Sequence, residues 1–263
     1  MSAADAATRS GVPGGAAGGL LDGKVAVITG AGSGMAKASV KVFVREGARV
    51  VAADISGAEQ DTAVEVGGGV LPVHCDVTKE AEVEALMAAA VEEFGRVDTV
   101  LNVAGIADGC LLTDLTMEFY DRLMDVDLRG VMLGMKHGIR TMLKTGGGSV
   151  VNWSSVGGLN GSAYTSVYQA AKHGIIGASK SAAIEFGTQG VRVNTICPGF
   201  ILTEIMAVGA EDFIPDIAAK AALNRAGLPH EVAEVGAFLA SDRASFVTGA
   251  VIPVDGGWSA KLA

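Results

Sequence analysis

The feature that most constrains this chain is an alternation of short apolar runs with longer stretches of helical spacing. The apolar runs occupy 24–29, 49–54, 70–75, 98–103, 149–154, 191–196 and 250–255, and the helical stretches 34–46, 79–94, 117–144, 166–188 and 230–240. Several runs are nearly continuous in Val, Ile, Ala and Leu, which is typical of strands buried on both faces. Strands that alternate with helices pair in parallel. The pattern therefore predicts an α/β fold in which helices cover both faces of a seven-stranded parallel sheet.

Composition limits the classes of function that the chain can serve. Its 263 residues are 49% hydrophobic, which is enough for one sizeable core without disulfides. The net charge of −9 excludes the basic footprint of a nucleic-acid-binding protein, so we expect no such partner. The three cysteines lack CxxC spacing and the four histidines are scattered, so we expect reduced structural thiols and no metal site.

The N-terminal region does not have the pattern of a targeting signal. Residues 1–20 are small, polar and rich in Gly and Ala, and they lack a basic segment followed by an apolar run. We expect a disordered tail there and one Rossmann-type domain over 21–263. No stretch approaches the roughly 18 apolar residues of a membrane span. These features predict a cytoplasmic protein with no membrane partner.

A glycine-rich turn follows the first predicted strand. The segment "TGAGSGMA" places Gly30, Gly32 and Gly34 where the chain turns from strand to helix. In open α/β sheets, ligands bind outside the carboxyl ends of the strands, and glycines there let the backbone approach a pyrophosphate at a helix N-terminus. The alternative interpretation is an ordinary strand-to-helix turn.

Three further strand ends carry residues suited to a dinucleotide. Asp54 closes the second strand at about the 20-residue separation expected of an acid that binds a ribose 2′-hydroxyl. A carboxylate there repels a 2′-phosphate and favours NAD over NADP, although Asp54 could instead cap a helix or a turn. Asp76 follows the third strand, and "NVAG" over 102–105 follows the fourth.

A phenol and an ammonium lie four residues apart in "YQAAKHG". Positions i and i+4 share one face of a helix, so Tyr168 and Lys172 can act on one ligand. Pairs of this kind also occur by chance on helix surfaces. The other motifs of the chain decide whether this pair is catalytic or merely exposed.

Taken in order, these segments resemble the short-chain dehydrogenase/reductase family over residues 20–258. The pieces are "TGAGSGMA", Asp76, "NVAG", "WSS", "YQAAK" and "CPGFILT". The resemblance implies NAD as cofactor and a catalytic set of Ser155, Tyr168 and Lys172, with Ser155 rather than Ser154 because it precedes the tyrosine by thirteen residues. The implied cofactor-binding residues are Gly30, Gly32, Ser33, Gly34, Met35, Asp54, Asp76, Val77, Asn102, Ala104, Gly105, Tyr168, Lys172, Pro198, Gly199, Ile201 and Thr203. The closing "IPVDGGW" resembles a strand that helps form tetramers in the family, which implies a homotetramer.

The chain departs from the family pattern at two positions. Ala36 replaces the third glycine of the turn and adds only a methyl group. Asp127, in "MDVDLRG", stands where the family has an asparagine that helps hold a water in a proton relay. Asp127 can keep the backbone role but adds a possible charge, so its place in the catalytic set is open.

The expected chemistry is hydride transfer between NAD(H) and a small molecule that carries a secondary alcohol or a ketone. Free tyrosine is a poor base at neutral pH, and the Lys172 ammonium favours the phenolate, so Tyr168 serves as general acid and base. Ser155 would bind the substrate oxygen. Segment 200–228 is predicted to form a lid over an apolar pocket that involves Ser155, Tyr164, Phe200 and Met206, which favours a lipophilic or cyclic substrate.

Two alternatives stay open from the sequence. One is a 3-oxoacyl-carrier-protein reductase, although members of that group often carry an arginine in the glycine turn and prefer NADP, whereas this chain has Ser33 and Asp54. The other is a redox sensor that binds NAD(H) without turnover, a reading supported by Asp127 alone.

Overall fold

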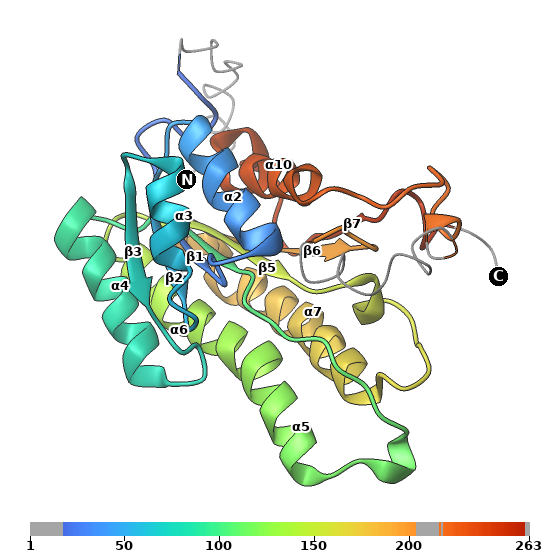
Figure 1. Ribbon diagram of the computed structural model, residues 1–263. Helices are drawn as coiled ribbons and strands as arrows, with labels where there is room; N and C mark the ends of the chain where they lie inside the picture. The colour runs from blue at the N-terminus through green and yellow to red at the C-terminus, as the bar shows by residue number, and fades with distance from the viewer. Residues whose placement is uncertain (1–17, 204–215, 217, 261–263) are drawn as a thin grey trace.

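The computed structural model describes residues 18–203, 216 and 218–260, and these contain one parallel sheet (Figure 1). Its strands are β1 (Val25–Thr29), β2 (Arg49–Asp54), β3 (Val70–His74), β4 (Thr99–Asn102), β5 (Gly148–Trp153), β6 (Val191–Pro198) and β7 (Val251–Val254). Their order is β3-β2-β1-β4-β5-β6-β7, and every neighbouring pair is parallel. The predicted seven-stranded doubly wound sheet is confirmed.

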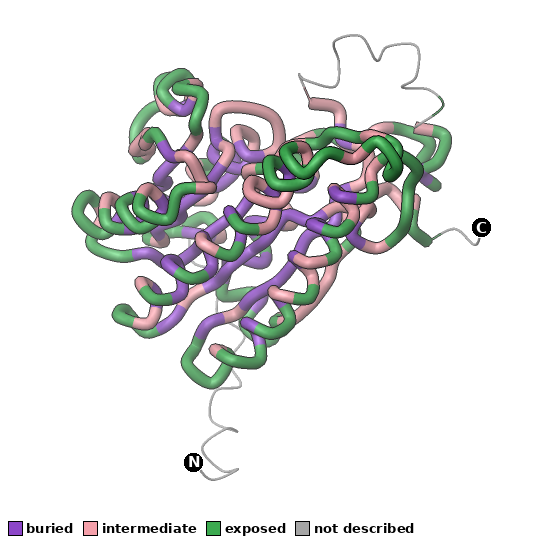
Figure 2. The backbone as a smooth tube through the Cα atoms, turned by 90° about the horizontal axis from the view of Figure 1, so that it is seen from below, coloured by how far each residue is buried: buried purple, intermediate pink, exposed green. Residues whose placement is uncertain are grey.

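Helices cover both faces of this sheet. One layer holds α2 (Gly34–Arg45) and α10 (Pro229–Ala240), with α3 (Glu59–Val66) beside α2, and the other holds α4 (Glu80–Phe94), α6 (Gly130–Met142) and α7 (Ser166–Phe186) (Figure 1). Each layer has its own apolar core: Phe43 and Leu239 lie in the first, Leu86 and Ile175 in the second. All five residues of β1 are buried, as expected of a strand covered on both faces. Figure 2 shows the buried segments in purple at the centre of the molecule.

Helix α3 was not predicted, and its composition explains why. Its sequence is EQDTAVEV, and its two buried residues are the polar Glu59 and Thr62. Thr62 donates its hydroxyl to the carbonyl of Ala31 at 2.9 Å, so a hydrogen bond rather than an apolar stripe holds the helix in place. A search for apolar residues at helical spacing cannot detect such a helix.

The predicted helix over 117–144 contains an irregularity that the sequence pattern did not reveal. It consists of α5 (Met117–Met124), a π-helical turn η3 (Asp125–Arg129) and α6. Turns of this kind are often found at functional sites. This one contains Asp127, which is fully buried.

Parts of two predicted segments lie outside the described residues. Of the predicted tail, 1–17 are outside, whereas the backbone N–H of Leu20 donates to Glu46 Oε2 at 2.9 Å. Of the predicted lid, 204–215 and 217 are outside, Met206 included. No helix in the described part of the chain is long and apolar enough to cross a membrane.

Candidate active site

The strand order reverses at β1, whose two neighbours are β2 and β4. Strands β2 and β4 lie on opposite sides of β1. The carboxyl end of β1 is therefore the switch point at which ligands bind in open α/β sheets. The hydroxyl of Thr29, the last residue of β1, accepts the backbone N–H groups of Val103 and Ala104 at 3.2 Å each. The loops that follow β1 and β4 are thereby tied together.

The glycines after β1 are required by close backbone packing. Gly30 has φ +76°, and a Cβ there would lie 2.9 Å from the Cα of Ala104. Gly34 has φ +53° and begins α2, which Ser33 precedes without a side-chain cap. The first N–H groups of α2 therefore have no side-chain acceptor from their N-cap residue, the arrangement that binds a phosphate at a helix N-terminus.

Asp54 is fixed beside this turn. Its Oδ2 accepts the Gly32 N–H at 2.9 Å, while Oδ1 accepts the N–H and the hydroxyl of Ser56 at 2.9 and 2.7 Å. A Cβ on Gly32 would lie 3.0 Å from the carboxylate carbon. Asp54 is half-buried, so part of the residue stays accessible.

Asp76 and Val77 follow β3 on the same edge of the sheet. Burial raises the pKa of Asp76, but hydrogen bonds from the hydroxyl and N–H of Thr78, at 2.7 and 2.9 Å, outweigh it and leave the pKa below its usual value. Val77 packs against Gly130 at the start of α6, where a Cβ would lie 2.9 Å from Val77 Cγ2. Asp76 is thus held as a carboxylate.

The side chain of Asn102 belongs to the core. It is buried, its Nδ2 donates to Asn152 Oδ1 at 2.7 Å, and a Cβ on Gly134 would lie only 1.9 Å from its Oδ1. This amide joins β4 to β5 beneath α6. Any contact of Asn102 with a cofactor therefore falls to its backbone.

The two serines after β5 have different surroundings. Ser154 is buried, and its hydroxyl donates to the carbonyl of Lys172 at 2.8 Å, which anchors α7 to the sheet. The hydroxyl of Ser155 accepts the Gly157 N–H at 3.0 Å and faces a hollow that Tyr168 also lines. Of the two serines, only Ser155 lines the hollow beside Tyr168.

Lys172 lies at the centre of a buried polar cluster. Its Nζ is 5.4 Å from the centroid of the Tyr168 ring, 3.5 Å from the Trp153 carbonyl and 3.1 Å from Asp127 Oδ2. The other Asp127 oxygen accepts the Ile106 N–H at 2.7 Å. Asp127 is 0% exposed and Lys172 is 5% exposed, so this ion pair is shielded from solvent.

Gly105 leaves room for that pair. A Cβ at Gly105 would lie 3.3 Å from both Asp127 Oδ1 and Lys172 Nζ. The π-helical turn on one side and the glycine on the other bring the carboxylate directly to the ammonium.

The segment after β6 reaches back to the glycine turn. Pro198 ends β6, and the Gly199 N–H donates to the Val254 carbonyl at 3.0 Å. Ile201 is buried and pairs with Gly227 in a short bridge. The methyl group of Thr203 would lie 3.3 Å from a Cβ on Gly34. Residues predicted to meet one cofactor therefore lie at the ends of five strands, β1, β2, β3, β4 and β6.

The hollow beside Tyr168 has a volume of about 740 Å³. Ser155, Gln169, Phe200 and Trp258 are among its lining residues. Tyr164 does not line it: the side chain is 62% exposed, the backbone has φ +67°, and the carbonyl accepts the Cys110 N–H at 2.7 Å. The structure therefore gives Tyr164 a role in linking two loops rather than in shaping this hollow.

Sequence reasoning missed Lys220, Gln169 and Trp258 as lining residues. Trp258 belongs to "IPVDGGW", which was interpreted only as an assembly segment, and Gln169 lies inside "YQAAK". Its place directly after Tyr168, a predicted catalytic residue, is a usable signal for Gln169. No local pattern marks Lys220.

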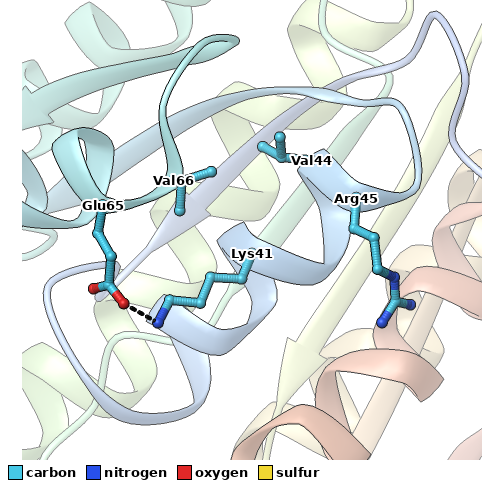
Figure 3. Close-up of a pocket in the computed structure, with 5 residues that line it drawn as sticks. All are labelled: Lys41, Val44, Arg45, Glu65 and Val66. Carbon is cyan, nitrogen blue, oxygen red and sulfur yellow. Dashed lines mark hydrogen bonds and ion pairs between the residues drawn. The ribbon is translucent and has the colours of Figure 1, made fainter.

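A second, shallower hollow of about 370 Å³ lies between α2 and α3 (Figure 3). Its charged side chains are all in ion pairs: Lys41 is 2.5 Å from Glu65, and Arg45 pairs with Glu46 and Glu234 outside the hollow. Hydrogen bonds from Lys37 and Lys41 lower the pKa of Glu65 to about 2. It contains no hydroxyl or thiol nucleophile. We therefore place the candidate active site at the larger hollow.

The described residues contain no group of three or more His, Cys, Asp or Glu side chains suited to a metal ion. All three cysteines are free thiols, and burial raises the pKa of Cys75 to about 12. Neither observation adds a redox or metal function to the site.

Comparison with known proteins agrees with this geometry. The family model described as enoyl-(acyl carrier protein) reductase matches residues 30–259. A cis-4-hydroxycyclohexanecarboxylate dehydrogenase of Sinomonas cyclohexanicum is 42% identical, with 90% of this chain and 97% of that protein covered. A 3-oxoacyl-[acyl-carrier-protein] reductase of Thermotoga maritima is 39% identical, with 90% and 98% covered.

A solved structure shares the fold as well. A short-chain type dehydrogenase/reductase from Mycobacterium marinum superimposes with a TM-score of 0.87 at 32% identity, covering 92% of this chain and 97% of that one. The chain therefore belongs to the short-chain dehydrogenase/reductase family and is an oxidoreductase, and relatives such as the one from Sinomonas cyclohexanicum are named as dehydrogenases that act on CH–OH groups.

Proposed function

We propose that this protein interconverts a secondary alcohol and the matching ketone with NAD(H), using Tyr168 as general acid and base. The observation that carries the proposal is the convergence of Ser155 and Tyr168 on one hollow, with Lys172 buried behind the tyrosine ring. A bound nicotinamide supplies or accepts the hydride.

The residues at the switch point fit a dinucleotide. Gly30 and Gly34 place no side chain between the backbone of the turn and a ligand, and the uncapped start of α2 offers N–H donors to a pyrophosphate. The Asp54 carboxylate, fixed at the turn, accepts ribose hydroxyls and repels a 2′-phosphate. This arrangement favours NAD over NADP.

Two side chains act on the substrate oxygen. Tyr168 takes the hydroxyl proton during oxidation and returns a proton to the carbonyl oxygen during reduction. Ser155 donates a hydrogen bond to the same oxygen and orients it. The Lys172 ammonium beside the tyrosine ring stabilises the phenolate.

Asp127 acts through Lys172. Its carboxylate is held by the Ile106 N–H and lies 3.1 Å from the ammonium, so it fixes the lysine in place. It also offsets part of the positive charge that Tyr168 experiences. We therefore assign Asp127 as a positioning residue, which replaces the family's asparagine by direct ion pairing.

The substrate that fits best is a cyclic secondary alcohol with an apolar body. Phe200 and Trp258 provide flat apolar surface in a hollow of about 740 Å³, and the relative from Sinomonas cyclohexanicum is named for a ring substrate. The second candidate is 3-oxoacyl-carrier-protein reduction, which the Thermotoga maritima relative favours. Asp54 and Ser33, in place of a basic residue at the turn, argue for the first.

The site is proposed to work in a cytoplasmic homotetramer. Phe246 is fully exposed and Phe238 is 40% exposed near the end of α10, which leaves apolar surface for a partner copy. The molar mass in solution, measured by light scattering, tests this assembly.

The proposed function is tested by nicotinamide absorbance during turnover. NAD⁺ and NADP⁺ are run in parallel over cyclic, steroidal and linear secondary alcohols, and a 3-oxoacyl thioester is run with the reduced cofactors. Turnover of a cyclic alcohol with NAD⁺ supports the proposal. Thioester reduction with NADPH supports the second candidate. NADH binding without turnover of any compound supports a sensor instead.

A further inference from the structure

One charged side chain faces the substrate hollow. Among the lining residues that the structure describes, Lys220 is the single one with a formal charge at neutral pH, and none is an Asp or a Glu. Within the described chain, no carboxylate forms an ion pair with Lys220. The protein as a whole carries a net charge of −9, so a positively charged hollow is a local exception.

The position of Lys220 is fixed by the turn that follows β7. Gly256 and Gly257 have φ +62° and +82°, and Cβ atoms there would lie 3.2 and 2.9 Å from the Cβ atoms of Ala221 and Ala222. The Leu223 N–H donates to the Gly256 carbonyl at 3.0 Å. The two segments are thus packed and hydrogen-bonded together directly beside the lysine.

The turn itself is held by Asp255. Its Oδ2 accepts the N–H and the hydroxyl of Ser259 at 2.8 and 2.6 Å, and its Oδ1 accepts the Gly257 N–H at 2.9 Å. This fixes Trp258, whose ring lies 5.6 Å from Lys220 Nζ. A cation over an indole ring is attracted by the ring face, so Trp258 holds the ammonium at the hollow.

We propose that Lys220, held over Trp258, binds a carboxylate on the part of the substrate that is remote from the reacting carbon. This rests on the proposed function, because Ser155 and Tyr168 must hold the reacting oxygen in the same hollow. The substrate class is then a hydroxy or oxo carboxylic acid with an apolar body between its two polar ends. This refines the lipophilic substrate expected from the sequence to one that also carries a carboxylate.

The donors beside Lys220 fit a carboxylate better than a phosphate. They are one ammonium and, elsewhere in the lining of the same hollow, neutral groups such as Asn160 and Ser162, which match a monoanion with two oxygens. Phosphate sites typically combine a helix N-terminus or guanidinium groups with several N–H donors. The described lining of the hollow contains no arginine.

The test compares the binding of a charged probe with that of its neutral analogue. Cyclohexanecarboxylate and cyclohexanecarboxamide are titrated into the full-length protein with bound NADH, and binding is read from the change in tryptophan fluorescence. We expect the carboxylate to bind about tenfold more tightly to the wild type. Lys220→Met should remove this preference, Lys220→Arg should keep most of it, and Lys180→Met, an exposed lysine of α7, should leave it unchanged.

Turnover provides the second readout. For 4-hydroxycyclohexanecarboxylate, Lys220→Met should raise KM about tenfold with little change in kcat, and it should leave the KM of the methyl ester unchanged. Equal binding of both probes to the wild type would overturn the subsite, as would an unchanged preference in Lys220→Met. A Lys220-dependent KM for a phosphopantetheine thioester, with none for the carboxylate, would assign the lysine to a phosphate instead.

Separate measurements test the proposed function and the Lys220 subsite. Turnover of the neutral methyl ester by the wild type reports the proposed function alone, because it needs no anion subsite. Carboxylate binding in the fluorescence titration reports the subsite alone, because it needs no chemistry. Unchanged melting temperatures confirm that each variant is folded.

Discussion

The cofactor end and the substrate end of the candidate site are built from different material. At the cofactor end, backbone packs on backbone: a Cβ on Gly30 would meet the main chain of Ala104, and the Thr29 hydroxyl ties both loops. At the substrate end, the hollow is enclosed by side chains from distant segments, among them Phe200 and Trp258.

This difference determines how freely the side chains at each end of the site can be replaced. Close backbone contacts leave no space for side-chain variation, so the cofactor end is constrained to one shape. Side chains around a hollow can be exchanged without moving a strand, so the substrate end is free to vary. We therefore expect substitutions at the cofactor end to impair cofactor binding and substitutions at the substrate end to impair the use of substrate.

The largest effect is expected at the point where the two ends meet. Tyr168→Phe removes only the hydroxyl that exchanges a proton with the substrate, so kcat should fall by about 10²- to 10⁴-fold. NADH affinity, measured by fluorescence titration, should stay within about twofold. A kcat close to that of the wild type would exclude Tyr168 as the general acid and base.

Gly30→Ala should damage the cofactor end without touching the substrate hollow. The new Cβ would lie 2.9 Å from the main chain of Ala104 at φ +76°, which we expect to cost about 1–3 kcal/mol of stability. NADH affinity should fall at least tenfold as the turn shifts. Gly23→Ala is the matched control, because Gly23 has φ +72° but no atom within 4 Å of its Cβ position. Equal NADH affinities in the two variants would show that the close contact is unimportant.

Asp54→Asn tests cofactor choice with the shape of the turn preserved. Removing the charge should lower the ratio of kcat/KM for NAD⁺ over NADP⁺ by about tenfold, since a charge-assisted hydrogen bond to ribose is lost and repulsion of a 2′-phosphate ends. Asp61→Asn removes an exposed carboxylate from α3 and should leave the ratio unchanged. An unchanged ratio in Asp54→Asn would place the cofactor preference elsewhere.

Asp127→Asn should change the pH dependence of the reaction. The groups that face Asp127 are Lys172 of α7 and the Ile106 N–H, and Lys172 in turn faces the Tyr168 ring and the Trp153 carbonyl. Without the carboxylate, the full Lys172 charge stabilises the phenolate, so the acid limb of kcat/KM for alcohol oxidation should move to lower pH. A merely structural role would instead lower the rate equally at every pH.

The fold was predictable because its strands are buried on both faces. The first four residues of β1, Val25 to Ile28, are all apolar and buried, and the segments between successive strands are long enough to hold helices. Helix α3 escaped prediction because polar Glu59 and Thr62 are its buried residues. The π-helical turn at 125–129 has no composition signal, because its sequence DVDLR contains no glycine or proline, and its contacts with α7 join segments distant in sequence.

The site was predictable only where residues close in sequence act together. The glycine turn and the pair Tyr168 and Lys172 belong to local segments: the turn lies between β1 and α2, and Lys172 Nζ lies 5.4 Å from the centroid of the Tyr168 ring. The ion pair of Asp127 with Lys172 and the contact of Lys220 with Trp258 join distant segments. Such pairs depend on tertiary packing, and one sequence alone does not contain that information.

The smallest effect is expected from the carboxylate of Glu231, which stabilises the start of α10. This residue belongs to neither the cofactor end nor the substrate end of the site. Glu231 Oε2 accepts the Leu228 N–H at 2.8 Å, and Arg225 donates to both carboxylate oxygens. The hydrogen bonds from Arg225 and then Leu228 lower the pKa of Glu231 to about 2 from a usual value of 4.5. Because these groups are partly exposed, Glu231→Gln should lower the free energy of unfolding at pH 7 by only about 1 kcal/mol.

The pH dependence of that difference follows from the direction of the shift. A carboxyl group whose pKa is lower in the folded state stabilises the protein above pH 4.5, and this contribution is lost as the pH falls towards about 2. Urea denaturation at pH 7, 4 and 3 should therefore show the gap between wild type and Glu231→Gln closing. Glu185→Gln, an exposed position on α7, should show no gap at any pH. A gap that stays constant with pH would mean that the carboxylate charge is not what stabilises this helix start.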